Sequence, residues 1–312
     1  MQIGILEPQD FSEATRASLK ELGNVSLFED NKLSEFIADK DILFIRLSHL
    51  IDKKFLIQAK KLKYICSPTT GLNHIDLEEC ERVNIKVISL KDENNFLFNI
   101  RATPEHTFGL ALSLLRNYKK AFLNQQNNRW NKELYIGFEL YENSVGIIGF
   151  GRVGKILAKY FEAFGAKVFF FDKDDAVKEV NSAVKMSCIE DVINNSNIII
   201  LSASYLESNK FFFDQKYIDL LKNKYFINTS RGELVDEDYL ISKIEQGFFK
   251  GAAIDTISNE QSNNNLEVLL KLSIKHNLII TPHISGTTYN SIHRTEEFIF
   301  RKLIKKLKNE SK

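Results

Sequence analysis

Short apolar runs alternate with longer segments of helical spacing along almost the whole chain. Such runs are typical of buried parallel strands, and the segments between them are typical of the helices that connect parallel strands. The first series of expected strands is Gln2–Leu6, Val25–Phe28, Ile42–Arg46, Tyr64–Ser67 and Lys86–Leu90. The second series is Ser144–Gly149, Lys167–Asp172, Asn197–Leu201, Tyr225–Asn228, Gly251–Asp255 and Leu278–Thr281. The alternation predicts an α/β fold with two parallel sheets covered by helices.

The length of 312 residues also suggests two domains, each able to bury a core of its own. A long helix is expected between the two series, over Thr103–Arg116, with Thr103 as its N-cap and Pro104 at its first position. A polar stretch, Asn124–Asn131, is expected to end this helical region. Shorter helices are expected over Phe11–Leu22 and Lys53–Lys60, and an amphipathic helix over Ser291–Leu307.

Composition argues against several other classes of protein. The 42 Lys and Arg residues nearly balance 41 Asp and Glu, which leaves a net charge of +1 and no basic excess for nucleic acid. No apolar run approaches the roughly 18–20 residues needed to cross a bilayer, and the N-terminus does not read as a signal peptide. Three cysteines without a CxxC pair are expected to be reduced thiols: Cys66, Cys80 and Cys188. We therefore expect a cytoplasmic protein with neither a membrane nor a nucleic-acid partner.

A glycine motif, GFGRVG over residues 149–154, separates an expected strand from an expected helix, Lys155–Phe164. Its first glycine permits a tight turn, its second lets the backbone approach a pyrophosphate, and its third lets helix and strand pack closely. The next expected strand ends in Asp172, 21 residues after Gly151 (172 − 151). A carboxylate there can accept both ribose hydroxyls and disfavours the extra phosphate of NADP, although Lys173 follows directly. The motif predicts NAD as the cofactor, bound at Gly149, Gly151, Arg152, Val153, Gly154 and Asp172.

Polar segments follow three of the later strands, where open α/β sheets bind their ligands. These segments contain Arg231, Glu260 and His283. A guanidinium can hold a carboxylate and polarise a neighbouring carbonyl oxygen, and an imidazole can move a hydroxyl proton near neutral pH. A nearby carboxylate can orient the imidazole and stabilise its protonated form. Hydride transfer between a 2-hydroxy acid and its keto acid needs this set, so the three residues are the expected catalytic groups.

With these motifs in this order, the chain resembles the D-isomer-specific 2-hydroxyacid dehydrogenase family from about Arg46 to its C-terminus. The family includes D-3-phosphoglycerate, D-lactate, glycerate and formate dehydrogenases. The resemblance implies two Rossmann-like or flavodoxin-like domains with the active site in the cleft between them. Residues 1–100 with 287–312 would form the substrate-binding domain, and residues 101–286 the NAD-binding domain.

The resemblance also implies roles for individual residues. Arg231 would bind the substrate, His283 would be the acid/base and Glu260 its partner, and the backbone amides of the loop at Thr70 and Gly71 would hold the substrate carboxylate. Further cofactor-binding positions would be Thr229, Asp255, which matches the acid at the nicotinamide carboxamide, and Gly286. His106 fits a Glu-His step to which we assign a structural role. No metal site is expected.

Arg46 stands where phosphoglycerate-type members often carry an arginine near the far end of the substrate. This gives 3-phosphoglycerate a slight lead over glyoxylate, hydroxypyruvate or a sugar-derived keto acid. The family pattern further implies a homodimer formed through the helix Thr103–Arg116 and the loop at Trp130.

Two other functions stay open. One is a non-catalytic NAD(H) sensor like the transcriptional corepressors of this fold. The other is a formate or phosphite dehydrogenase. Formate-type relatives carry a glutamine in place of the glutamate, whereas the residue five positions after Asp255 here is Glu260 and not Gln261, which argues against this function.

Overall fold

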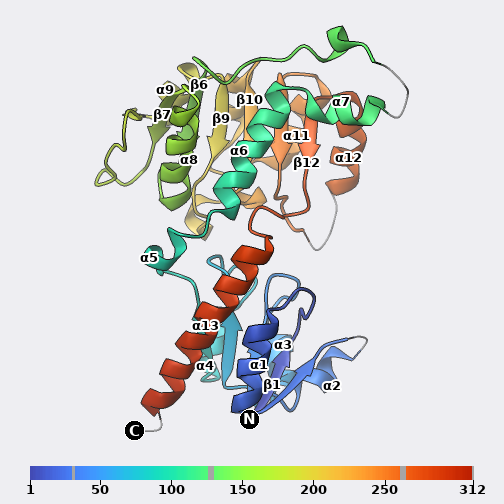
Figure 1. Ribbon diagram of the computed structural model, residues 1–312, viewed down its shortest axis with the longest axis vertical. Helices are drawn as coiled ribbons and strands as arrows, with labels where there is room; N and C mark the ends of the chain where they lie inside the picture. The colour runs from blue at the N-terminus through green and yellow to red at the C-terminus, as the bar shows by residue number, and fades with distance from the viewer. Residues whose placement is uncertain (30–31, 126–129, 261–264, 311–312) are drawn as a thin grey trace. The chain divides into compact units, whose positions relative to one another are not determined.

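The computed structural model describes residues 1–29, 32–125, 130–260 and 265–310, and it divides into two compact units (Figure 1). The first unit comprises Met1–Ile100 together with Thr287–Lys312, and the second comprises Arg101–Gly286. Each unit is built around one sheet whose strands are all parallel.

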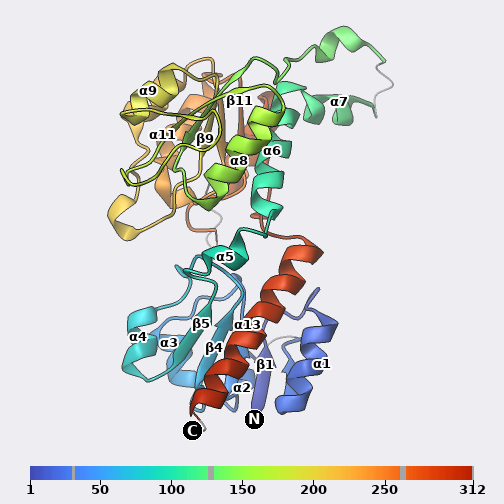
Figure 2. The ribbon, with the colours of Figure 1, turned by 60° about the vertical axis from the view of Figure 1, so that its left-hand side comes forward.

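The sheet of the first unit has the strand order β2-β1-β3-β4-β5, which is the order of flavodoxin-like folds. Its strands are β1 (Gln2–Ile5), β2 (Asn24–Leu27), β3 (Ile42–Phe44), β4 (Tyr64–Ser67) and β5 (Lys86–Ser89). Helices cover both of its faces, as Figure 2 shows. One core lies under α1 (Glu13–Leu22), α5 (Asn94–Leu97) and α13 (Tyr289–Glu310), and the other under α2 (Leu33–Ile37), α3 (Lys53–Gln58) and α4 (Leu77–Arg82).

The sheet of the second unit has the order β12-β11-β10-β9-β6-β7-β8. Its strands are β6 (Ser144–Ile148), β7 (Lys167–Phe171), β8 (Val184–Lys185), β9 (Ile198–Leu201), β10 (Tyr225–Asn228), β11 (Gly251–Ile254) and β12 (Leu278–Ile280). If β6 to β12 are renumbered 1 to 7 and the sheet is read from β8, the order is 3-2-1-4-5-6-7, which is the Rossmann order with a seventh strand added. The direction of strand addition reverses between β6 and β9, which is where open α/β sheets place their ligand crevice.

Helices again cover both faces of this sheet. One core lies under α6 (Ala102–Leu115) and α8 (Arg152–Ala163). The opposite core lies under α9 (Ile189–Asn194), α10 (Gln215–Ile218), α11 (Glu237–Glu245) and α12 (Leu266–Lys275). A further helix, α7 (Tyr118–Gln125), follows α6.

The structure confirms every predicted strand to within two residues at either end. The last helix, α13, contacts α1, β4 and β5. The predicted strand ends at Arg46, Gly149, Asp172 and Asp255 each lie one or two residues beyond the observed strand, in the loop that follows. Among the described residues, the strand that the sequence pattern does not predict is β8, because two residues are too short to show a period.

Two details of the predicted central helix are wrong. The helix starts at Ala102 with Arg101 as N-cap, so Thr103 lies inside the first turn and Pro104 is its third residue. Proline is tolerated there because the amides of the first turn have no partner within the helix. The region is also two helices rather than one, since Asn117 adopts a left-handed conformation (φ 53°) between α6 and α7. Similarly, α8 begins at Arg152 rather than Lys155.

In the described part of the chain, no helix has the length and apolar character needed to cross a membrane.

Candidate active site

The glycine loop follows β6, beside the point where the sheet order reverses. Gly149 has a φ of 93°, and a Cβ there would lie 2.5 Å from the amide nitrogen of Ala203. A Cβ on Gly154 would lie 2.6 Å from the carbonyl oxygen of Gly149. The fold itself therefore requires glycine at both positions, because the turn is left-handed and the helix lies against the loop.

Gly151 differs from both, because a Cβ at this position would meet no atom within 4 Å. Its φ of −71° is open to any residue, so the chain's own packing gives no reason for a glycine. The open space lies at the N-terminus of α8, where Arg152 and Val153 begin the helix and the helix dipole favours an anion. A pyrophosphate pressed against the backbone supplies the missing reason, so these residues fit a dinucleotide.

Asp172 lies directly beyond β7 and is tied to the same loop. Its carboxylate accepts hydrogen bonds from the amide of Phe150 (2.7 Å) and from the amide of Asp174 (3.0 Å). These bonds hold the acid beside the glycine loop, in the place where a ribose would follow a pyrophosphate.

Arg231 lies in the loop after β10, whose shape is fixed by Asn228. The Asn228 amide group donates to the Arg231 carbonyl (3.0 Å) and accepts from the Ser230 amide (3.0 Å). Gly232 allows a close approach to the next loop, since a Cβ there would lie 2.1 Å from the carbonyl carbon of Ile257. Burial lowers the pKa of Arg231 from its ordinary value, and nearby acids, Glu260 first among them, oppose that shift. The backbone of Arg231 is thus held in place, and its guanidinium is partly buried.

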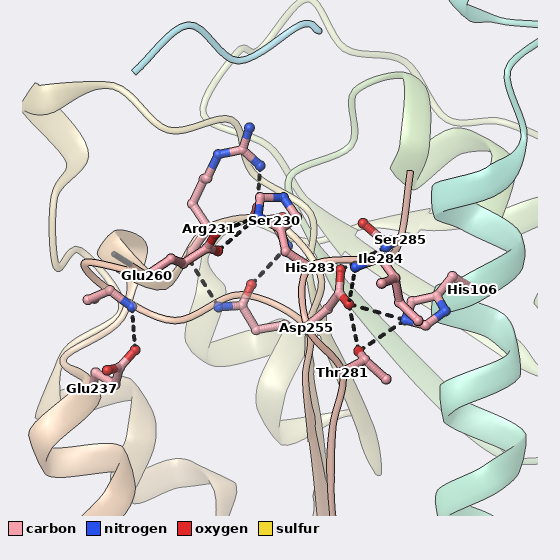
Figure 3. Close-up of polar contacts among 12 residues, drawn as sticks. His106, Ser230, Arg231, Glu237, Asp255, Glu260, Thr281, His283, Ile284 and Ser285 are labelled. Atoms are coloured by element: carbon pink, nitrogen blue, oxygen red, sulfur yellow. Dashed lines mark hydrogen bonds and ion pairs between the residues drawn. The ribbon is translucent and has the colours of Figure 1, made fainter. Parts of the chain in front are cut away.

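His283 and Glu260 form a close pair in the turn after β12 and the loop after β11 (Figure 3). Nδ1 of His283 lies 2.8 Å from Oε1 and 2.9 Å from Oε2 of Glu260. A carboxylate can only accept at these distances, so Nδ1 carries a proton and Nε2 is the nitrogen that can exchange one with a ligand. The backbone of His283 is left-handed (φ 50°), which is uncommon outside glycine, and its amide is held by the Asp255 carbonyl (2.8 Å).

Asp255 holds this turn by hydrogen bonds to its backbone. The Asp255 carboxylate accepts from the Thr281 hydroxyl (2.6 Å) and from the amides of Ile284 (2.9 Å) and Ser285 (3.0 Å), and His106 Nε2 lies 3.4 Å away. Burial acts to raise its pKa, but the donors from His106, Thr281 and the two amides prevail and hold the pKa at about 2. The side chain is 0% exposed, so in this structure it stabilises the turn and offers no surface to a cofactor.

The remaining predicted cofactor positions are both in the second unit. The Thr229 hydroxyl lies 2.7 Å from that of Thr107 on α6 and is buried, so it joins the loop after β10 to that helix. Gly286 ends the unit and is exposed, with nothing within 4 Å of a Cβ.

The predicted substrate residues of the first unit lie in the loops after β3 and β4. Thr70 is exposed, and the loop is held by the Thr69 hydroxyl, which donates to the Gly71 carbonyl (3.0 Å). The Arg46 guanidinium is bound within the unit: Nη2 lies 2.6 Å from Glu296 Oε1 on α13, and Nη1 donates to the Gln9 carbonyl (3.0 Å). Glu296 is 0% exposed and also accepts from the Ser12 amide (2.8 Å). Arg46 therefore neutralises a buried acid of its own chain.

Sequence reasoning missed one supporting acid of the site, Glu237 on α11. Glu237 accepts from the Ser258 amide (2.7 Å) and from the Asn265 side chain (2.7 Å), which fixes the loop that leads to Glu260. Burial raises the pKa of Glu237. No local signal marks this residue, because its partners lie more than twenty positions away along the chain. Gln261 lies outside the described residues.

A Rossmann sheet whose crevice carries a dinucleotide loop and an Arg–Glu–His set defines a nicotinamide-dependent oxidoreductase. The family model described as D-isomer specific 2-hydroxyacid dehydrogenase, NAD binding domain, matches residues 108–285. The chain belongs to this family and is an NAD-dependent D-2-hydroxyacid dehydrogenase.

Individual relatives agree with the family. A glyoxylate reductase of Pyrococcus furiosus is 29% identical over 88% of this chain and 81% of its own length. A D-3-phosphoglycerate dehydrogenase of Methanocaldococcus jannaschii is 27% identical over 99% of this chain but only 58% of its own length. The solved structure of a D-lactate dehydrogenase from Aquifex aeolicus, complexed with NAD and lactic acid, has the same fold, with a TM-score of 0.84 at 24% identity over 99% of this chain and 96% of that one.

Proposed function

We propose that the enzyme reduces a small, unphosphorylated 2-keto acid, such as glyoxylate or hydroxypyruvate, to the 2-hydroxy acid. The observation that carries this proposal is the pairing of His283 with Glu260, which leaves Nε2 of His283 as the proton donor. The ion pair of Arg46 with Glu296 then argues against a phosphorylated substrate.

The chain's own residues account for the proton and for the charges. In the second unit, the Arg231 guanidinium binds the substrate carboxylate and polarises the C2 oxygen. In the first unit, we assign the backbone amides at Thr70 and Gly71 to substrate binding. Protonated His283 gives its Nε2 proton to that oxygen, while Glu260 accepts from Nδ1 and stabilises the imidazolium. In the opposite direction, Nε2 takes the hydroxyl proton.

NADH, when bound, supplies the hydride that reduces C2. The residues that would hold it are Gly149, Gly151, Arg152, Val153 and Gly154 at the pyrophosphate and Asp172 at the ribose. We also assign Thr229, Asp255 and Gly286 to cofactor binding. Asp255 would act indirectly, by holding the turn at His283. In the described residues, no three His, Cys, Asp or Glu side chains are grouped so that they could hold a metal ion.

The substrate class depends on Arg46. A phosphate at the far end of the substrate would need a guanidinium whose charge is available, whereas the Arg46 charge is matched by Glu296 at 2.6 Å. The similarity to the glyoxylate reductase of Pyrococcus furiosus extends over most of both chains and supports the same choice. We therefore place glyoxylate and hydroxypyruvate ahead of 3-phosphohydroxypyruvate, whereas on sequence alone we expect a slight lead for the phosphorylated substrate.

The test is NADH oxidation at 340 nm against glyoxylate, hydroxypyruvate, pyruvate and 3-phosphohydroxypyruvate. We expect kcat/KM for one of the first two to exceed that for the phosphorylated compound by at least roughly tenfold, the size of one lost charged hydrogen bond. His283→Ala should lower kcat roughly 10²–10⁴-fold and leave NADH binding intact. Preference for the phosphorylated compound would overturn the substrate class, and NADH binding without any turnover would favour the sensor.

We further propose that the first unit binds the substrate, that the second binds NAD, and that the protein is a cytoplasmic homodimer. The cytoplasmic location is supported by the three cysteines, which are all free.

Exposed apolar side chains support the dimer. Trp130 is 97% exposed, Ile136 75% and Phe122 62%. Gly109, in the middle of α6, is exposed with nothing within 4 Å of a Cβ, although glycine costs a helix about 1 kcal/mol relative to alanine. Close approach by a second copy of the chain explains both features. Sedimentation should give twice 36.0 kDa for the wild type and a larger monomer fraction for Ile136→Glu, and a wild-type mass of 36.0 kDa would contradict the proposal.

A further inference from the structure

His106 lies on α6, outside the catalytic set, and its ring reaches the acid that supports the catalytic turn. Nε2 of His106 lies 3.2 Å from the Thr281 hydroxyl and 3.4 Å from Oδ1 of Asp255. Figure 3 draws both contacts as dashed lines. All of these residues belong to the second unit. The His106 side chain is mostly buried, so few waters can replace it at this position.

The hydrogens in this group can be placed by their donors. Asp255, with its pKa of about 2, carries no proton at neutral pH and only accepts. The Thr281 hydroxyl has one proton and gives it to Asp255 at 2.6 Å. Since neither partner can donate to the ring, Nε2 of His106 carries a proton and is the donor to both.

The group is connected to His283 in two ways. The Asp255 carboxylate holds the amides of Ile284 and Ser285, and the Asp255 carbonyl holds the amide of His283 itself. Because the backbone of His283 is left-handed, the turn depends on these bonds to keep its conformation. A shift of Asp255 therefore moves the imidazole that exchanges the proton.

We propose that His106 is a positioning residue, whose Nε2–H fixes Asp255 and Thr281 and thereby the turn that aims His283. This inference rests on the proposed function for its kinetic test only. It assigns His106 a role in the reaction rather than the structural role that the sequence suggested.

The variant His106→Leu removes the donor, and His106→Gln keeps an N–H at the end of a side chain. Leu110→Ala is the matched control, because Leu110 lies one turn further along α6, is buried in the apolar core of the same unit and has no polar group to donate to Asp255 or Thr281. Misplacement of a catalytic group by about 1 Å can lower a rate by roughly 100-fold, so a smaller shift of His283 corresponds to a loss of roughly 10- to 100-fold. We expect kcat to fall by that factor in His106→Leu, with the Kd for NADH changed less than about threefold, and to recover most of the loss in His106→Gln.

The second readout is hydrogen exchange in the enzyme without substrate. The amides of Ile284 and Ser285 should exchange at least roughly tenfold faster in His106→Leu than in the wild type, and at the wild-type rate in Leu110→Ala. Equal losses of kcat in His106→Leu and Leu110→Ala, or unchanged exchange at the two amides, would overturn the proposal. If the wild type reduces no 2-keto acid, the proposed function fails, while the exchange rates still decide the role of His106.

Discussion

Replacement of Arg46 by methionine, which removes the guanidinium, tests whether this arginine stabilises the fold or binds substrate. In Arg46→Met, the carboxylate of Glu296 stays buried with the Ser12 amide as its remaining donor. Loss of one partner of a buried ion pair costs about 3–5 kcal/mol. Because the Arg46 side chain is 23% exposed and water can enter where it stood, we expect about 3 kcal/mol, close to the lower limit.

The variant should also make stability depend on pH. Burial already raises the pKa of Glu296, against the opposing effects of Arg46 and the Ser12 amide. Without Arg46 the pKa rises further, so the folded state binds a proton that the unfolded state releases. An acid whose folded pKa is raised destabilises the fold as the pH rises through that window. Arg46→Met should therefore be more stable at pH 5 than at pH 8.

Urea unfolding followed by circular dichroism measures both effects. The double variant Arg46→Met/Glu296→Met should recover most of the lost free energy of unfolding, since it leaves no unpaired charge. The KM for glyoxylate should change less than roughly threefold. A fully stable Arg46→Met whose KM rises tenfold or more for 3-phosphohydroxypyruvate alone would refute this reasoning and make Arg46 an anion site.

Three further predictions concern the second unit. Gly151→Ala should leave the free energy of unfolding within about 0.5 kcal/mol of the wild type and weaken NADH binding at least roughly tenfold in a fluorescence titration. The control Gly149→Ala should lose stability, because Gly149, unlike Gly151, has a left-handed φ and a close backbone neighbour. At pH values above its ordinary pKa of 3.8, the Asp255 carboxylate contributes about 2 kcal/mol of stability. The difference in stability between the wild type and Asp255→Asn should therefore shrink as the pH falls from about 4 towards 2. A difference that stays constant would contradict the lowered pKa of Asp255. Glu260→Ala should lower kcat by roughly 10- to 100-fold without changing the Kd for NADH, and a change in Kd alone would remove Glu260 from the catalytic set.

Local patterns determined the fold class and the cofactor. Strand periodicity and the glycine loop are short-range features, because a strand or a tight turn is encoded within a few neighbouring residues. The approximate distance from Gly151 to Asp172 is likewise set by one helix and one strand. For the same reason the sequence placed polar residues such as Arg231 and His283 just beyond strand ends.

Short-range patterns were weaker at boundaries. Thr103 is a good N-cap by residue type, but the helix starts earlier, at Ala102, whose side chain is buried. Packing of the first turn outweighed the capping preference, since a side-chain cap is worth only about 1 kcal/mol. The two-residue strand β8 pairs with β7 and has no signal of its own.

The partners of charged groups were decided by the tertiary structure alone. Arg46 binds Glu296, 250 positions away, and Asp255 turns its carboxylate into the protein to hold the His283 turn. His106, on helix α6, lies close to the Asp255 carboxylate, which belongs to the loop after β11. Residue type tells which groups can bond, but which of them meet depends on how sheets and helices stack, and that is a property of the whole folded unit.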